Sequence, residues 1–427
     1  MMNLKYLITI GAALAAAACS RPTDSGGFTR HVDPKIGTGS HGHVFVGANV
    51  PFGLVQVGPT SIPQTWDWCS GYHASDSTVI GFSHTHLSGT GIGDLFDVTV
   101  MPVTGDVTYA RGTEDTPTLG LWFYADRIQE IARPGYYSVP LTRYGIRAEL
   151  TATARVGLHR YTFPASDAAA VVFDLKNGGC WDKATETHLA KEGDRTVTGW
   201  RHSTGWAKDQ RVYFAAEFSK PFEKFETIGD NYARASFRTT DGEEVLLKVA
   251  LSPVSVEGAK ANLAAELPEW DFDATAKAAD KAWNDELSKV KIETADETAR
   301  RIFYTALYHT MIAPSVFCDV NGDYYGSDHA IHRNADFTNY TTFSLWDTYR
   351  AAMPLMTVLH PEKMPDIVNT MLTICDEQGR LPVWHLWGNE TDCMVGNPGI
   401  VAVADAIVKG IGGFDREKAF EAIRKTP

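Results

Sequence analysis

The spacing of apolar residues changes near Ala259, and this change constrains the fold more than any other feature of the sequence. From residue 28 to about residue 258, short apolar or alternating runs such as 169–175 and 244–251 recur between clusters of Gly, Pro, Asn and Asp. Many short strands without intervening helices indicate two packed antiparallel sheets. The sequence therefore predicts a β-sandwich over residues 28–258.

The remainder of the chain has a helical period. Residues 259–294 are rich in Ala, Lys, Glu and Asp, which is typical of linker helices. Between Met364 and Cys375 the apolar residues share one helical face, and Gly379 follows as a C-cap. We therefore predict linker helices over 259–294 and a helical domain over 295–427. The sequence reaches Pro427 shortly after a new helix opens, so we expect this domain to be incomplete.

The N-terminus has the pattern of an export signal. Lys5 precedes an apolar stretch at 6–18 that is too short to span a bilayer permanently. Ala16-Ala17-Ala18-Cys19 resembles a bacterial lipobox, in which Cys19 would carry the lipid; the alternative is an ordinary signal peptide with an incidental Cys. We expect a signal over 1–19 and an exported lipoprotein, periplasmic or on a bacterial cell surface. The anchor would be its only contact with the membrane.

The overall composition excludes some classes of partner and favours another. A net charge of −13 disfavours nucleic acid, because the phosphate backbone would repel such a surface. The 11 Trp residues are compatible with sugar binding, since an indole face stacks on the C–H face of a pyranose, although large core residues explain most of them. The five Cys after Cys19 are widely spaced and lack a C-x-x-C pair, which predicts buried thiols.

Two H-x-H pairs, His41/His43 and His84/His86, could each present two imidazoles to one metal ion. Amidohydrolase-type sites place such a pair on the first strand of an α/β barrel, and no α/β alternation follows here. We therefore treat zinc as the lesser alternative. Polar contacts from His84 and His86 to a sugar are the preferred interpretation.

A second polar group lies in the helical part. Asp347 and Arg350 are three residues apart at a predicted helix start beside Trp346, an arrangement that could grip vicinal hydroxyls. A surface ion pair at a helix start explains the spacing equally well. Glu390 could act as a general acid if it were desolvated. Its polar neighbours favour a binding role instead.

At these motifs the sequence resembles glycoside hydrolase family 92, the inverting, calcium-dependent exo-α-mannosidases. The segments that carry the resemblance occur in the family's order: VDPKIGTG, PFGLVQVGP, WDWCSGY, GFSHTHLSGTG, SLWDTYR and GNETDCM. The resemblance implies an N-terminal β-sandwich packed on an (α/α)6 barrel, with a mannose pocket between them. It also implies mannose-containing glycans as partners.

The resemblance assigns candidate substrate-binding residues to both domains. On the sandwich side these are Trp66, Trp68, Cys69, His84, Thr85 and His86, with Trp181 added from the segment 177–182. On the barrel side they are Trp346, Asp347, Arg350, Trp384, Asn389 and Glu390.

The family's catalytic acid, its base and most calcium ligands belong to later segments, which we expect beyond Pro427. No residue of this chain is therefore assigned to catalysis, and its metal ligands stay unassigned. Pro398 also stands where the family pattern has a His or similar residue. We expect an α-mannosidase that trims mannose from glycans, with this portion inactive by itself. The alternatives are a non-catalytic glycan-binding lipoprotein or an inert truncated product. A glycoside phosphorylase is disfavoured, because the helical half shows no basic or Gly-rich anion cradle.

Overall fold

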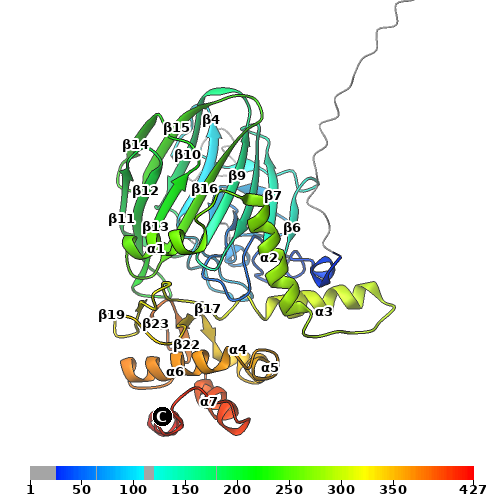
Figure 1. Cartoon of the computed structure of the whole chain (residues 1–427), viewed down its shortest axis with the longest axis vertical. Coiled ribbons are helices and arrows are strands. Elements are labelled where there is room, and N and C mark those ends of the chain that lie inside the picture. Colours follow the sequence, from blue (N-terminus) through cyan, green and yellow to red (C-terminus); the bar gives the residue numbers. More distant parts are fainter. Residues whose placement is uncertain (1–25, 64, 110–119, 179) are drawn as a thin grey trace, which may run out of the picture.

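Two stacked β-sheets are followed along the chain by helices, as Figure 1 shows. The computed structural model of the protein describes residues 26–63, 65–109, 120–178 and 180–427. The predicted signal segment and Cys19 lie outside the described residues. The order of a β-sandwich followed by a helical domain confirms the predicted fold class.

Each sheet of the sandwich is built from antiparallel neighbours. The first sheet has the strand order β1 (Gly58–Thr60), β3 (Gly81–Ser83), β4 (Thr99–Thr104), β10 (Ser166–Asp174), β15 (Tyr232–Thr239) and β14 (Lys224–Ile228). The second has the order β11 (Lys183–Glu192), β12 (Thr196–Thr204), β13 (Gln210–Phe218), β16 (Glu243–Ser252), β9 (Val156–Phe163), β8 (Ile146–Ala152), β7 (Tyr136–Leu141) and β6 (Ile131–Arg133).

Alternating burial along the strands explains how the two sheets pack. In β15 and β12, buried and partly exposed residues alternate, so each strand presents an apolar face to the other sheet. Phe173 of one sheet packs on Phe214 and Phe218 of the other, with ring centroids 6.1 and 6.2 Å apart. The connection from β15 in the first sheet to β16 in the second turns at Gly242, whose φ of 75° favours glycine.

Helices α1 (Val256–Glu266) and α2 (Phe272–Leu287) follow β16 and pack against the second sheet, where Tyr136 contacts Phe272 at 6.3 Å. They therefore cover the sandwich as well as link it to α3 (Glu297–His309). Side chains cap these helices as their sequences require, since Ser255 and Asp271 accept hydrogen bonds from backbone N–H groups of the first turn.

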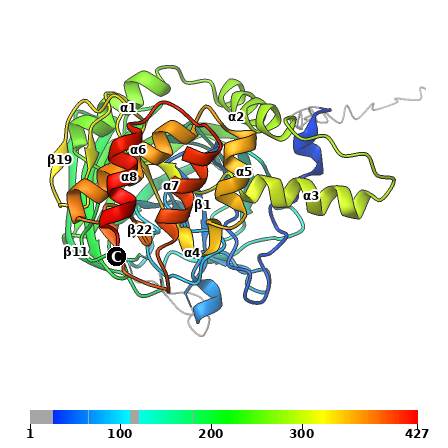
Figure 2. The same ribbon diagram turned by 90° about the horizontal axis from the view of Figure 1, so that it is seen from below.

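The remaining elements form the helical domain. Its helices are α4 (Leu345–Thr348), α5 (Ala352–Leu359), α6 (Met364–Gln378), α7 (Pro398–Val408) and α8 (Arg416–Lys425). Gly379 ends α6 with a φ of 90°, as predicted, and the predicted apolar face of α6 is buried. Seen from below, α5, α6, α7 and α8 lie together over one end of the molecule (Figure 2).

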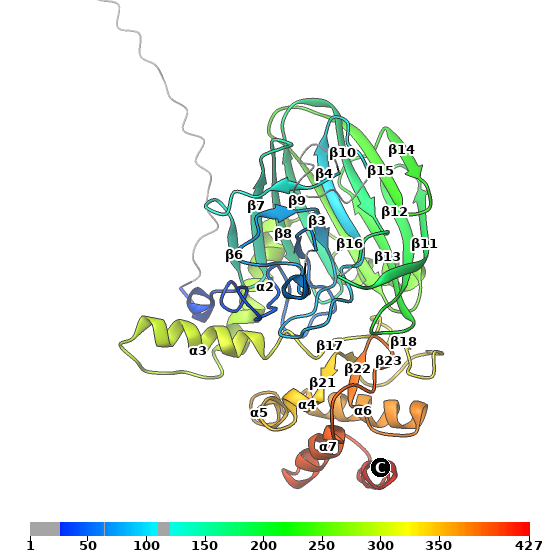
Figure 3. The same ribbon diagram turned by 180° about the vertical axis from the view of Figure 1, so that it is seen from behind.

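Short strands connect this domain with the sandwich (Figure 3). They are the pairs β17 (Ser315–Val316) with β20 (Tyr340–Thr341) and β18 (Tyr324–Tyr325) with β19 (Ile331–His332), and the small sheet β21 (Phe343–Ser344), β22 (Trp384–Leu386) and β23 (Asn389–Glu390). Residues of β22 belong to the same apolar cluster as the sandwich core. Across this boundary Phe52 donates its N–H to the Met311 carbonyl and accepts from Val316, both at 2.8 Å. No helix among the described residues has the length and apolar character needed to cross a bilayer.

Candidate functional site

Two exposed tryptophans flank one glycine-rich loop of the sandwich. Trp66, in the short 3-10 helix η2 (Trp66–Trp68), is 47% exposed and donates its indole N–H to the Gly91 carbonyl at 2.9 Å. Trp181 is 40% exposed, and its backbone N–H donates to the Gly93 carbonyl at 3.4 Å. Neither loop glycine has room for a Cβ, which would fall 2.6 Å from Trp66 or 3.0 Å from the Trp181 ring. The glycines thus let both indoles approach the backbone closely.

Asp94 follows this loop and holds the backbone of a third tryptophan, Trp206, which no sequence motif indicated. The buried Asp94 carboxylate accepts hydrogen bonds from the backbone N–H groups of Trp206 at 3.0 Å and Ala207 at 2.8 Å. Burial raises the pKa of Asp94 to about 6, although these two N–H donors act in the opposite direction. Trp206 is half-buried, and its indole N–H finds no acceptor within the described parts of the chain.

Trp206 connects the sandwich side of the site with the helical domain. Its ring lies 6.0 Å from that of Trp384 in β22. Asn389 stands next to this contact: its Oδ1 accepts from the Asp209 N–H at 3.0 Å, and its Nδ2 donates to the Asp209 carbonyl at 2.9 Å. We call Trp66, Trp181, Trp206 and Trp384 the tryptophan group. Contacts through the loop at 91–94 and the ring pair Trp206–Trp384 therefore connect its members from the sandwich loops to β22.

Asp347 lies beside this group, but its predicted pairing with Arg350 does not form. Ser344 of β21 pairs with Trp384, and its hydroxyl donates to Asp347 Oδ2 at 2.6 Å. Both Asp347 and Arg350 are exposed, and Arg350 makes no hydrogen bond or ion pair with any residue that the structure describes. Helix α4 ends at Thr348, so Arg350 lies beyond its end and the i, i+3 spacing of a helix does not apply to this pair. The alternative of a surface Asp–Arg ion pair is thus wrong, whereas Asp347 Oδ1 is left open to a ligand and the sugar-binding role of both residues stays a prediction. Trp346 is half-buried against the apolar cluster that contains Trp384.

Glu390 holds the β22–β23 turn together. Its carboxylate accepts from the N–H groups of Trp384, Val383 and Asp392 at 2.9, 2.8 and 3.0 Å. Three backbone donors occupy both oxygens, so the side chain orients Trp384 and is not presented to solvent as an acid.

His84, Thr85 and His86 lie beneath the surface. His84 has 0% exposure, and its two ring nitrogens contact the Val98 carbonyl at 2.6 Å and His159 Nε2 at 2.9 Å. His86 is bound to the Gln56 carbonyl at 2.8 Å and Thr85 to Asp97 at 2.7 Å. Burial lowers the pKa of His84 to about 3 and that of His86 to about 4, so both rings are neutral at pH 7. In this structure the three side chains therefore contact protein atoms beneath the surface of the site.

Cys69 and Trp68 also face protein atoms. The buried Cys69 thiol donates to the Thr90 carbonyl at 3.3 Å, and burial raises the pKa of Cys69 to about 12, which keeps the thiol protonated. Trp68 stacks on His73 with ring centroids 4.5 Å apart, and its indole N–H donates to Asp76 at 2.6 Å. One face of the Trp68 ring and its only donor are therefore occupied.

A buried ionic network underlies Trp181. Arg201 donates from both Nη atoms to Asp182 at 2.9 and 2.8 Å and from Nη1 to Asp97 at 2.7 Å. Burial would lower the pKa of Arg201, but the Asp182 and Asp97 carboxylates raise it above its ordinary value. Asp97 also accepts from Gln210 at 2.9 Å, so one guanidinium ties the segments around Thr85, Trp181 and Asp209 together. No sequence motif indicates this network, because its members come from separate segments of the chain.

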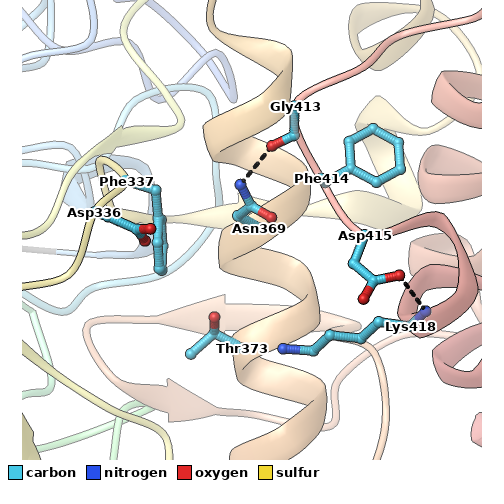
Figure 4. A pocket seen from close by; sticks show the side chains of 8 residues that line it. All are labelled: Asp336, Phe337, Asn369, Thr373, Gly413, Phe414, Asp415 and Lys418. Atoms are coloured by element: carbon cyan, nitrogen blue, oxygen red, sulfur yellow. Dashed lines mark hydrogen bonds between the residues drawn. The ribbon is translucent and has the colours of Figure 1, made fainter.

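A cavity of about 540 Å³ lies elsewhere, on the helical domain (Figure 4). It contains no tryptophan or histidine, and its lining residues are Asp336, Phe337, Asn369, Thr373, Gly413, Phe414, Asp415 and Lys418. Asp415 caps α8 and Asn369 donates to the Gly413 carbonyl at 3.1 Å, so its polar groups serve the local fold.

Calcium requires six to eight oxygen ligands. In the described parts of the chain, three groups of metal-ligating side chains converge, and each includes an imidazole: His41/His43/Asp67, Glu286/His360/Glu362 and Asp328/His332/Glu377. These groups do not fit a calcium site, and no catalytic step is derived through that ion.

The chain matches models of two domains of one enzyme family. The glycosyl hydrolase family 92 N-terminal domain matches residues 31–252, and the family's catalytic domain matches residues 258–427. A family 92 α-mannosidase from Bacteroides thetaiotaomicron, solved in complex with mannoimidazole, is 38% identical with a TM-score of 0.90 over 94% of this chain and 55% of its own. The inverting family 92 mannosidase from Bacteroides thetaiotaomicron VPI-5482 is 28% identical with a TM-score of 0.83 over 94% and 55%.

A curated relative, an uncharacterized secreted glycosidase of Arthroderma benhamiae, is 25% identical over 99% of this chain and 55% of its own length. The chain thus spans 55% of the length of each of these three relatives.

Proposed function

Because the chain belongs to glycosyl hydrolase family 92, we propose that the protein is an exo-acting, inverting α-mannosidase that removes terminal mannose from glycans. The observation that carries this proposal is the tryptophan group, which runs from the sandwich to β22 with Asp347 beside it. One solved relative carries the sugar analogue mannoimidazole, and another is described as an inverting mannosidase.

The chemistry of this surface suits a pyranose. The exposed indole faces of Trp66 and Trp181 offer apolar area for the C–H face of the sugar ring. Asp347 Oδ1 is an acceptor without a partner among the described residues and suits a sugar hydroxyl group, whereas the unpartnered indole N–H of Trp206 is buried. We propose that Trp66, Trp181 and Asp347 contact the sugar. Trp206 and Trp384 lie behind them, and Asn389 and Glu390 hold this pair in place through Asp209 and the backbone of Trp384.

Hydrolysis with inversion needs an acid and a base whose carboxyl groups are about 6.5–9.5 Å apart. Asp94 is buried against the Trp206 loop, and both oxygens of Glu390 are occupied by backbone donors. We therefore assign neither role to a described residue. Calcium dependence of the whole protein is part of the proposal.

The test compares sugars and linkages on the full-length protein. We expect release of mannose from 4-nitrophenyl α-mannoside and α-mannobiose, with the β-anomer appearing first in the proton NMR spectrum. Trp66→Ala should raise KM about tenfold, whereas Trp200→Ala should leave KM unchanged, because Trp200 stacks on His188 at the edge of the sandwich. Binding of mannosides without release would favour the alternative of a glycan-binding protein. Preferential cleavage of α-glucosides would contradict the mannosidase proposal.

We also propose export with a lipid at Cys19. The proposal rests on the Ala16–Cys19 pattern, and a relative is described as secreted. Labelled palmitate should be incorporated into the wild-type protein, and Cys19→Ala should release soluble protein. A soluble wild-type protein whose mature N-terminus lies elsewhere would contradict it.

A further inference from the structure

His41, His43 and Asp67 converge at the edge of the tryptophan group. Asp67 Oδ1 lies 2.6 Å from His41 Nδ1 and 3.3 Å from His43 Nε2. The His43 side chain is buried, that of Asp67 is partly exposed and that of His41 is 69% exposed. No other hydrogen bond of the Asp67 side chain occurs within the described ranges. One carboxylate oxygen thus faces two imidazole nitrogens, and one side of the cluster is open to solvent.

The backbone forces this convergence. A Cβ at Gly42 would overlap the Gly37 carbonyl oxygen, so the position between the two histidines accepts only glycine. Ser40 and His43 have positive φ values of 52° and 51°, which are uncommon for residues other than glycine. Non-glycine residues held in such conformations tend to cluster at functional sites. The loop is therefore shaped to point His41 Nδ1 and His43 Nε2 at one place.

The other two converging groups differ in ways that matter for a metal ion. In the group of Glu286, His360 and Glu362, the Lys289 ammonium lies 2.7 to 3.2 Å from all three side chains and already supplies the positive charge. The group of Asp328, His332 and Glu377 has one imidazole, and His332 Nε2 lies 3.1 to 3.3 Å from both carboxylates, so that single nitrogen already contacts both acidic side chains. The His41–His43–Asp67 group combines two imidazoles with a single carboxylate, and among the described residues no Lys or Arg forms an ion pair with Asp67.

We propose that His41 Nδ1, His43 Nε2 and Asp67 bind one divalent transition-metal ion, with Zn²⁺ as the best fit. Imidazole nitrogens and one carboxylate are typical zinc ligands, whereas Ca²⁺ prefers oxygen ligands alone. Ligands about 2.0–2.1 Å from a tetrahedral Zn²⁺ lie about 3.3 Å from one another. His43 Nε2 and Asp67 Oδ1 already have this separation, and the three ligand atoms lie within 4.8 Å of one another. His41 Nδ1, which is 2.6 Å from the same Asp67 oxygen, belongs to an exposed side chain that is free to adjust.

The ion would position Trp66. The Trp66 ring contacts both imidazoles, with centroids 4.3 Å from His43 and 5.3 Å from His41, and Asp67 is the next residue in η2. A metal ion bound by these three side chains would join the loop at 37–43 to η2. It would thereby fix the indole that we place against the sugar, and Trp66 is thus the link between this site and the proposed function.

Metal binding can be measured without any enzyme assay. The protein is freed of tags, treated with EDTA, dialysed and titrated with Zn²⁺ by calorimetry, and with Co²⁺ by visible absorption. We expect one high-affinity Zn²⁺ per chain and the visible bands of tetrahedral Co²⁺. His41→Ala and Asp67→Asn should each weaken Zn²⁺ binding at least tenfold. His41→Ala is the primary variant, because the His41 side chain is exposed and its removal should leave the fold intact. Circular dichroism checks that the variant is folded.

Two variants serve as controls. His188→Ala removes an exposed histidine of β11, and His332→Ala removes the imidazole of a rival group; both should retain wild-type Zn²⁺ affinity. An unchanged Zn²⁺ affinity in folded His41→Ala would overturn the proposal. So would Ca²⁺ displacing Zn²⁺ at equal concentration, or a loss of binding in His332→Ala alone. A protein that binds Zn²⁺ but cleaves no mannoside would contradict the proposed function and leave the metal site standing.

Discussion

Asn389 and Asp209 exchange two hydrogen bonds across the boundary between the sandwich and the helical domain. The Asp209 N–H donates to Asn389 Oδ1 at 3.0 Å, and Asn389 Nδ2 donates to the Asp209 carbonyl at 2.9 Å. The same Nδ2 also donates to the Trp387 carbonyl at 2.7 Å. A side-chain amide here satisfies the backbone much as a neighbouring strand would. Trp206 and Trp384 face each other within three and five residues of this pair.

Asn389→Ala should therefore destabilise the protein by about 2–3 kcal/mol, because three hydrogen bonds are lost and buried backbone groups are left without partners. Urea unfolding followed by tryptophan fluorescence measures the change. Asn369→Ala is the matched control, since that more exposed side chain donates a hydrogen bond to the Gly413 carbonyl and its loss should cost less than about 1 kcal/mol. A raised KM with unchanged stability would instead indicate that Asn389 contacts the sugar directly.

Local patterns in the sequence predicted the fold well. The period of α6 and its terminal Gly379 follow from neighbouring residues, and the structure confirms both. Asp415 caps α8 with a side chain of a type favoured at helix starts. These features depend on helix geometry and capping alone, so no knowledge of the tertiary structure is needed.

The site was harder to predict, because it depends on contacts between distant segments. Nothing near Trp206 distinguishes it from a core tryptophan; its position is set by Asp94, which is 112 residues away. His84 has the residue type of a sugar ligand, but the sheet buries it against His159. Asp347 and Arg350 were paired by helical spacing, yet α4 is too short for that geometry. The substrate-binding roles stay predictions.

Gly91→Ala should lower affinity for the sugar without unfolding the protein. The added methyl group would lie 2.6 Å from the Trp66 indole, which is exposed enough to swing away and so lose its place in the tryptophan group. We expect KM to rise about tenfold with a change in unfolding free energy below about 1 kcal/mol. Gly412→Ala provides the control, because no heavy atom lies within 4 Å of its added methyl group. Equal kinetics for the two variants would exclude Trp66 as a stacking platform.

Arg201→Met should be among the most destabilising single changes in the sandwich. It leaves Asp97 and Asp182 buried without their shared counter-ion, and breaking a buried pair in this way costs about 3–5 kcal/mol. Chemical denaturation measures the loss. Arg238→Met is the control, because its ion pair with Glu223 is exposed and solvent screening leaves such pairs with little effect on stability. A similar effect in both variants would mean that the network contributes no more than a surface ion pair.

Asp347→Ala should lower kcat/KM of the full-length enzyme on an α-mannoside by about a hundredfold or more. A charge-assisted hydrogen bond to the sugar contributes about 1.5–3 kcal/mol, which corresponds to most of this loss. The carboxylate also accepts from Ser344, so Ser344→Ala tests whether that local bond explains the effect. We expect less than about a fivefold loss in Ser344→Ala. Near wild-type kinetics in Asp347→Ala would leave the side chain with a purely local role.

Asp94 should make the stability of the protein depend on pH in the direction opposite to most carboxylates. Burial raises the pKa of Asp94 from 3.8 to about 6, so the folded state holds a proton that the unfolded chain releases between these values. The stabilisation is complete below pH 3.8 and is lost as the pH rises through about 6. A shift of this size corresponds to about 3 kcal/mol. Asp94→Asn cannot titrate, so its unfolding free energy relative to wild type should increase by most of that amount, about 2 kcal/mol, between pH 4 and pH 7.

Urea unfolding of both proteins at several pH values measures this difference. Glu243→Gln is a control of opposite sign: a hydrogen bond from Lys220 lowers the pKa of Glu243, so wild type should gain stability relative to that variant as the pH rises. A difference between wild type and Asp94→Asn that does not change with pH would show that Asp94 titrates as in the unfolded chain. The Trp206 loop would then be held by an ionised carboxylate throughout, because the two N–H donors would outweigh the cost of burying the charge.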